Sequence, residues 1–66
     1  MDIGNTIRSL RKEAGFTQTE LAKKLGITQD TVSLWELNKS LPDILMLIKI
    51  CKIFNVSADY ILNLDM

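Results

Sequence analysis

The chain has 66 residues, enough for one small domain over residues 1–66, and its 47% hydrophobic and 24% charged residues are typical of a folded globular protein. One cysteine and no histidine exclude an internal disulfide, a histidine-containing zinc site and histidine acid–base catalysis. We therefore expect no metal, no cofactor and no enzyme activity. Eight basic and eight acidic residues cancel, so a broad basic surface is not expected.

The single cysteine, Cys51, lies among apolar residues, which suggests a reducing compartment. The longest apolar run, residues 44–48, is far shorter than the roughly 20 residues of a membrane span. The first three residues lack the positive charge of a signal peptide. We expect a cytoplasmic protein that does not enter a membrane.

Apolar residues recur at helical spacing along nearly the whole chain, and no stretch alternates as a half-buried strand does. The pattern predicts a compact all-α domain of five helices. The first spans residues 3–14, with Asp2 as its cap and Gly15 at its end, since glycine readily takes the left-handed conformation that terminates helices. Its inner face is expected to consist of Ile3, Ile7, Leu10 and Ala14.

The second helix is predicted over residues 18–25. Thr17 and Glu20 form a capping box ahead of it, in which each side chain satisfies the other residue's backbone N–H. Gly26 ends the helix.

The third helix is predicted to follow Thr28, its cap, and to run to about residue 37. Asp30 in its first turn suits the helix dipole. Val32 and Trp35 lie three residues apart and are expected to point inward together.

The fourth and fifth helices are predicted over residues 44–54 and 58–64, capped by Asp43 and Ser57. In the fourth helix, a single buried face would comprise Ile44, Leu47, Ile50, Cys51 and Phe54.

A three-residue turn, residues 26–28, joins the second and third helices and opens with glycine. Such a turn sets two helices at the steep angle of a helix-turn-helix. The motif needs a small residue where the helices cross, here Ala22, and a positive φ at Gly26. Apolar residues must fill the wedge behind the two helices, here Leu21, Leu25, Ile27, Val32 and Trp35. We therefore predict a helix-turn-helix over residues 18–37.

Residues 17–29, residues 32–36, Pro42 and residues 55–62 resemble the lambda-repressor-like helix-turn-helix family of the Cro/repressor or Xre type. The resemblance covers almost the whole chain. It implies a five-helix fold and a transcriptional regulator, usually a repressor, that binds double-stranded DNA sequence-specifically as a homodimer on a palindromic operator. The third helix, about residues 29–37, would be the recognition helix in the major groove.

The resemblance also implies roles for single residues. Gln29 occupies a position that often reads a base, and glutamine can pair bidentately with adenine. Arg11 and Glu36 match a structural ion pair that ties the first helix to the end of the third. The DNA-contacting set implied in this way comprises Gln18, Thr28, Gln29, Asp30, Ser33, Leu34, Asn38, Lys39 and Ser40.

The expected recognition surface carries little positive charge. Residues 1–40 hold six basic and five acidic residues, a net charge of +1. Leu34 can offer only apolar contact, and Asp30 suits DNA only as an acceptor from a cytosine amino group. We expect modest affinity for each monomer and a weak dependence on salt.

The fourth helix is apolar on nearly every side, which leaves apolar surface uncovered in so small a domain. We expect a homodimer through the fourth and fifth helices, with two recognition helices about one DNA turn apart. Scattered exposed apolar residues without a partner are the alternative. The expected dimer interface comprises Leu45, Met46, Ile53, Ile61, Leu64 and Met66.

A second interpretation keeps the scaffold and changes the partner. Zero net charge, Asp30, Leu34 and Leu37 suit a protein-binding surface better than a phosphate-binding one. An antitoxin-like or anti-repressor protein with weak or no DNA binding is therefore the alternative function.

Overall fold

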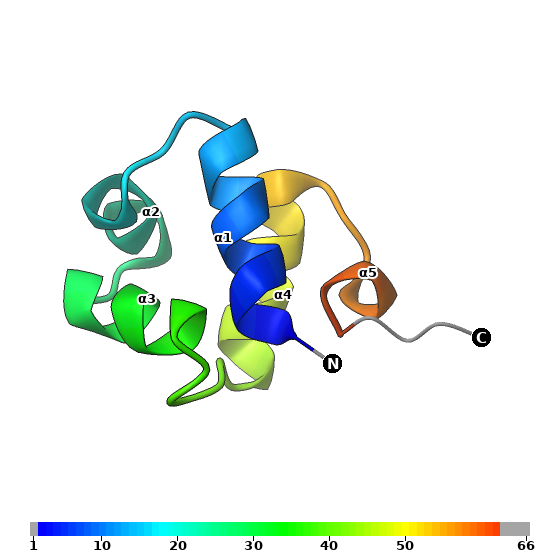
Figure 1. Ribbon diagram of the computed structural model, residues 1–66. Coiled ribbons are helices and arrows are strands. Elements are labelled where there is room, and N and C mark those ends of the chain that lie inside the picture. Colours follow the sequence, from blue (N-terminus) through cyan, green and yellow to red (C-terminus); the bar gives the residue numbers. More distant parts are fainter. Residues whose placement is uncertain (1, 63–66) are drawn as a thin grey trace.

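The computed structural model describes residues 2–62 and contains five helices in that range and no strand (Figure 1). The all-α fold class is therefore confirmed. The first and third helices end one residue earlier than predicted, and the predicted end of the fifth lies outside the described residues. The helices are α1 (Ile3–Glu13), α2 (Gln18–Leu25), α3 (Gln29–Glu36), α4 (Ile44–Phe54) and α5 (Ala58–Leu62).

Short side chains begin the helices as the sequence predicts. At α2, the Glu20 backbone N–H donates to Thr17 Oγ1 at 3.0 Å, and the Thr17 backbone N–H donates to the Glu20 carboxylate at 2.8 Å. Hydrogen bonds to the Glu20 carboxylate, first from the Thr17 backbone N–H and then from the Thr17 side chain, hold the pKa of Glu20 below its usual range. The predicted caps of the other helices also accept a backbone N–H, namely Asp2, Thr28, Asp43 and Ser57.

Residues with positive φ follow four of the helices, and Asn38 is the one after α3, with φ of +59°. Gly15 and Gly26 have φ values of +78° and +72°, as their positions after α1 and α2 predict. Asn55 takes the same conformation after α4, with φ of +55°. Asparagine tolerates this region better than most residues with a Cβ, so it serves here in the place of glycine.

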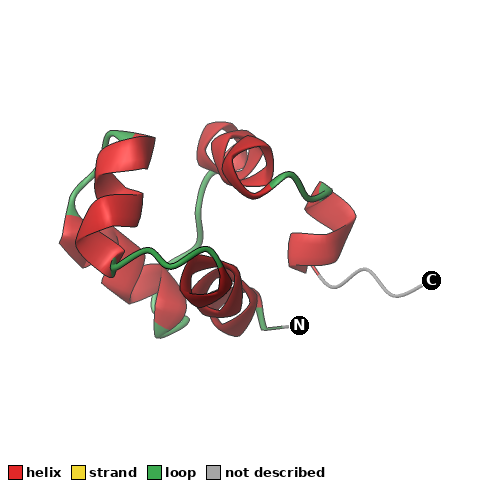
Figure 2. Ribbon diagram, turned by 90° about the horizontal axis from the view of Figure 1, so that it is seen from above, coloured by secondary structure: helices red, strands yellow, loops and turns green. Residues whose placement is uncertain are grey.

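α1 and α4 lie between α2 and α3 on one side and α5 on the other; they overlap in Figure 1 but lie apart in the view from above in Figure 2. α3 packs against both α1 and α2, and α5 packs against α1 and α4. One hydrophobic core joins all five helices. Its fully buried members are Ile7, Leu21, Leu25, Val32, Ile50 and Ile61.

The inward orientation predicted for Val32 and Trp35 is confirmed, since they are 0% and 3% exposed. Two other predictions of burial are wrong. Ala14 is exposed because it caps α1 beyond the last turn that packs on the core. Ile44 is 75% exposed because the first turn of α4 extends past the neighbouring helices, and Met46 packs against the core there instead.

The residues expected to form a dimer interface differ in exposure. Leu45 is 70% exposed, as expected. Met46 and Ile53 are half-buried and pack against the core. Ile61 is fully buried, so its assignment to an interface is wrong: the short α5 turns this side chain into the core between the helices. Leu64 and Met66 lie outside the described residues.

Gly4 lies where the start of α1 meets the end of α3. A Cβ on this residue would overlap the Trp35 carbonyl oxygen. The Gly4 backbone N–H donates to Asn38 Oδ1 at 3.0 Å, and Asn38 Nδ2 donates to Asp2 at 2.9 Å. Glycine is thus required here for the close approach of two backbones.

In the described part of the chain, no helix is long and apolar enough to cross a membrane.

Replacing Gly4 with alanine should lower the free energy of unfolding by about 1–3 kcal/mol, because the new methyl group clashes with a backbone oxygen. Urea denaturation measures this change. Asn5→Ala, at the neighbouring exposed helical position, is the matched control and should be close to neutral. Equal stability of Gly4→Ala and the control would contradict the close approach.

Candidate nucleic-acid interface

α2 and α3 pack against each other through the turn that the sequence predicts. Ala22 is 2% exposed, and its carbonyl oxygen accepts the Ile27 backbone N–H at 3.0 Å. Gly26 supplies the left-handed residue, and Thr28 Oγ1 then accepts the Thr31 backbone N–H to begin α3. This arrangement buries the inner face of α3 and leaves its outer face free.

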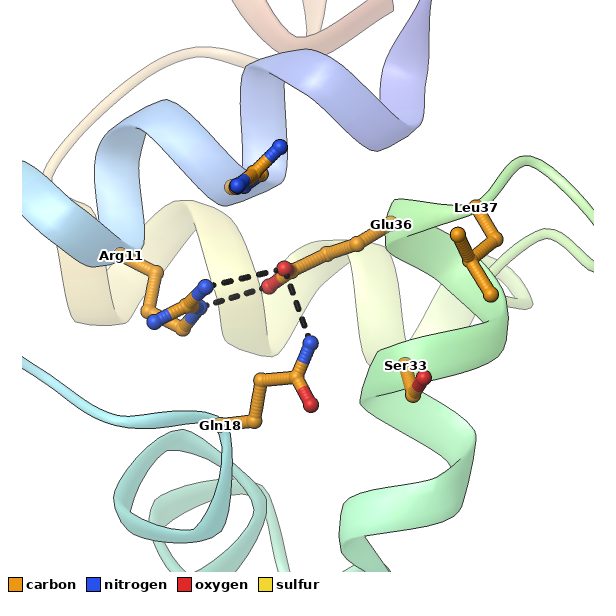
Figure 3. Close-up of a pocket in the computed structure, with 6 residues that line it drawn as sticks. Arg11, Gln18, Ser33, Glu36 and Leu37 are labelled. Carbon is orange, nitrogen blue, oxygen red and sulfur yellow. Dashed lines mark hydrogen bonds and ion pairs between the residues drawn. The ribbon is translucent and has the colours of Figure 1, made fainter.

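An ion pair fixes the end of α3 to α1. Arg11 Nε donates to Glu36 Oε2 at 2.7 Å, and a second guanidinium nitrogen donates to Glu36 Oε1 at 3.0 Å (Figure 3). The remaining nitrogen donates to the Phe16 carbonyl oxygen at 2.9 Å. The two side chains are only 11% and 5% exposed. This is the ion pair that the family resemblance implies, and its fork geometry holds three segments together.

The environment of the pair keeps both groups charged. Burial raises the pKa of Glu36, but the hydrogen bonds from Arg11 and Gln18, together with the Arg11 charge, outweigh it and hold that pKa below its usual value of 4.5. The hydrogen bond to Glu36 raises the pKa of Arg11. No buried polar side-chain atom within residues 2–62 lacks a hydrogen-bond partner.

A relay of side-chain amides extends from this pair to the outer face of α3. Gln18 Nε2 donates to Glu36 Oε1 at 3.1 Å, and Gln29 Nε2 donates to Gln18 Oε1 at 2.6 Å. Figure 3 shows Gln18 pointing from α2 toward the Glu36 carboxylate. Spacing along the sequence does not reveal the contact between the two glutamines, which are 11 residues apart.

The relay dictates which way each amide points. A carboxylate only accepts hydrogen bonds, so Gln18 must turn its NH₂ group toward Glu36 and its oxygen outward. Gln29 must then turn its own NH₂ group toward Gln18. One N–H and the carbonyl oxygen of Gln29 are left to meet a ligand. The outer face of α3 therefore presents one donor and one acceptor at a fixed place.

Other predicted contact residues lie on the same side of the motif. Asp30 is exposed and Leu34 is 42% exposed, while Ser33 is half-buried. Thr28 is exposed, but its hydroxyl lies 3.0 Å from the Thr31 hydroxyl.

The loop after α3 contains the remaining predicted contacts. Lys39 is exposed and Ser40 is half-buried, and both backbone N–H groups donate to the Leu34 carbonyl oxygen. Asn38 has φ of +59°, and its amide is held by the start of α1 through Gly4 and Asp2. The structure thus gives Asn38 a role in joining α3 to α1, whereas contacts of all three residues with DNA remain predictions.

A cavity of about 260 Å³ opens between α1, α2 and α3. Sequence reasoning missed one of its residues, Arg8, and considered Leu37 only as part of a protein-binding surface. Arg8 lies one turn before Arg11, so the spacing of three would have placed it beside the ion pair once that pair was known. The cavity is lined by Arg8, Arg11, Gln18, Ser33, Glu36 and Leu37.

Within residues 2–62 no group of acidic or cysteine side chains could hold a metal ion.

Comparison with known proteins identifies relatives across nearly the whole chain. Residues 7–61 match the family model described as helix-turn-helix. The HTH-type transcriptional regulator ImmR of Bacillus subtilis (strain 168) is 38% identical over 65 residues, which are 98% of this chain and 51% of that protein. The chain thus spans about half the length of this relative. Antitoxin HipB of Escherichia coli (strain K12) is 47% identical over 36 residues, covering 54% of this chain and 41% of HipB.

Two solved structures have the same fold. The P22 c2 repressor in complex with a synthetic operator superposes with a TM-score of 0.87 at 30% identity, covering 92% of each chain. SinR, the master regulator for biofilm formation, in complex with DNA superposes with a TM-score of 0.83 at 36% identity, covering 91% of this chain and 97% of that one.

Glu36→Gln should lower the free energy of unfolding by about 3–5 kcal/mol, because it leaves a buried guanidinium without its counterion. Urea denaturation at neutral pH measures the loss. The double variant Arg11→Met/Glu36→Leu removes both charges and should be more stable than Glu36→Gln alone.

The same pair predicts how stability depends on pH. Because the pKa of Glu36 is lowered on folding, its contribution is complete above the unfolded value and disappears as the pH falls through the folded value. The native chain should therefore lose stability below about pH 4.5, and Glu36→Gln should lose less over that range. Parallel pH profiles for the two proteins would contradict the pairing.

Proposed function

Because the chain belongs to the lambda-repressor-like helix-turn-helix family, we propose that it is a transcriptional regulator that binds double-stranded DNA sequence-specifically. α3 would enter the major groove with its first turns against the base edges. The observation that carries this proposal is the relay that holds the Gln29 amide in one orientation on the outer face of α3.

The orientation of Gln29 favours one base. In the major groove, adenine presents the N6 amino donor beside the N7 acceptor, whereas guanine presents two acceptors. Gln29 offers its carbonyl oxygen and one remaining N–H, which complement adenine. Turning the amide over to suit another base would break its hydrogen bond to Gln18. A relay anchored on the buried carboxylate of Glu36 thus supports discrimination at one base pair.

Two copies of the chain would be needed to recognise a palindromic operator, and the surface offers a place for them to meet. Large apolar side chains gather on the loop after α3 and the first half of α4. We call this set the apolar ridge; it comprises Leu37, Leu41, Ile44, Leu45 and Ile48, which are 47–75% exposed. We propose that the ridge of one copy packs against that of a second, because exposed apolar clusters of this kind mark interfaces.

An antitoxin-like or anti-repressor role is the second candidate. The match of 36 residues to antitoxin HipB and the exposed Leu34 and Leu37 favour it. It differs from the first proposal in one measurement, because a protein that binds only a protein partner retains no duplex in an electrophoretic mobility shift.

Gln29→Ala should abolish discrimination at a single base pair, lowering the preference for adenine there by about 1–3 kcal/mol. Selection from a random duplex library, followed by sequencing, gives the preferred site of each protein. Thr19→Ala on the exposed side of α2 is the control and should select the same site as the native chain. Unchanged selection by Gln29→Ala would exclude the proposed reading of adenine.

Leu45→Glu should convert the dimer to a monomer, because it places a charge in the middle of the apolar ridge. Light scattering at micromolar concentration measures the molecular mass. Thr19→Glu adds the same charge on α2 and should remain dimeric. A native chain that is monomeric under these conditions would refute the proposed interface.

A further inference from the structure

We propose that the cavity between α1, α2 and α3 receives a phosphodiester group of the DNA backbone, and that Arg8 is the residue that binds it. The inference rests on the proposed DNA-binding function and adds a contact that the sequence did not suggest.

The lining of the cavity contains one more positive charge than negative charge. It contains two arginines, Arg8 and Arg11, and one carboxylate, Glu36, a net charge of +1. The Arg11 guanidinium donates hydrogen bonds to Glu36 and to the Phe16 carbonyl oxygen. Within residues 2–62, no hydrogen bond or ion pair occupies the exposed Arg8 side chain. The charge of Arg8 does help to lower the pKa of Glu36, so the two groups share one region.

The rest of the lining suits an acceptor such as phosphate. Gln18 donates one N–H to Glu36 and retains a second. Ser33 on α3 has a hydroxyl that can donate (Figure 3). The arginine fork matches two phosphate oxygens at once, which an ammonium group cannot do. These groups come from three different helices and converge on one opening.

The position of the cavity relates it to DNA. Gln18 belongs both to its wall and to the relay that orients Gln29, and Ser33 lies one turn after Gln29 on α3. A duplex seated with a base edge at Gln29 therefore brings its sugar–phosphate chain across the mouth of the cavity. Because α3 itself contains no lysine or arginine, Arg8 would supply an important part of the electrostatic attraction.

A salt titration tests the assignment. Each phosphate neutralised by a cation contributes about 0.9 to the slope of log affinity against log salt. A fourfold rise in salt should therefore weaken DNA binding by both proteins, and the loss of affinity per bound copy should be about 3.5 times smaller for Arg8→Gln than for the native chain. The loss of affinity caused by Arg8→Gln at a given salt concentration should be equal on the selected site and on a scrambled duplex, since a phosphate contact carries no sequence information. Fluorescence anisotropy with labelled duplexes gives both values.

Two variants serve as controls. Arg8→Lys keeps the charge and should keep the native slope. Lys24→Gln removes one positive charge elsewhere and should also keep it: the Lys24 ammonium lies 4.9 Å from the centre of the Phe16 ring, which in turn contacts Phe54 on α4. Thermal unfolding followed by circular dichroism verifies that every variant is folded.

The outcomes distinguish failure of the phosphate assignment at Arg8 from failure of the proposed DNA-binding function. A native slope in Arg8→Gln overturns the phosphate assignment while leaving the proposed function intact. An altered base preference in Arg8→Gln also overturns it, because that result indicates a base contact. Failure of the native chain to retain any duplex overturns the proposed function and this inference with it.

Discussion

The buried ion pair between Arg11 and Glu36 is the contact on which the rest of the candidate interface depends. It joins α1 to the end of α3, and its carboxylate also holds Gln18 and, through Gln18, Gln29. A carboxylate accepts hydrogen bonds and never donates them, so the direction of every bond in the relay follows from it. A single buried charge thereby determines the orientation of an amide at the molecular surface.

The start of α1 provides a second support for the same helix. Asn38 takes a left-handed conformation, and its amide joins Asp2 and the Gly4 backbone N–H. α3 is therefore held from its end by α1 in two places, Glu36 and Asn38, while its first turn is anchored through Thr28 and Gln29. An eight-residue helix is too short to be stable alone, so α3 depends on these contacts with its neighbours for its stability.

The sequence was sufficient to predict the five helices because the signals that begin and end a helix are local. Caps such as Thr17 and Asp43, glycines after helices and apolar spacing each act within a few residues. Errors arose where burial depends on distant elements: Ile44 extends past its neighbours, and Ile61 turns inward on a short helix. The amide relay and the cavity beside Arg8 were not predictable for the same reason, since their residues come from three helices.

The distribution of charge connects the two surfaces proposed for this protein. α3 contains no lysine or arginine, so one copy can gain only limited attraction from DNA phosphates. Two copies joined through the apolar ridge would present two such faces to one duplex, and the second would bind at a high effective concentration. The ridge includes Leu37, which also lines the cavity beside Arg8. Association of two chains and contact with the DNA backbone would then involve adjoining parts of one surface, and occupancy of an operator would rise steeply with protein concentration.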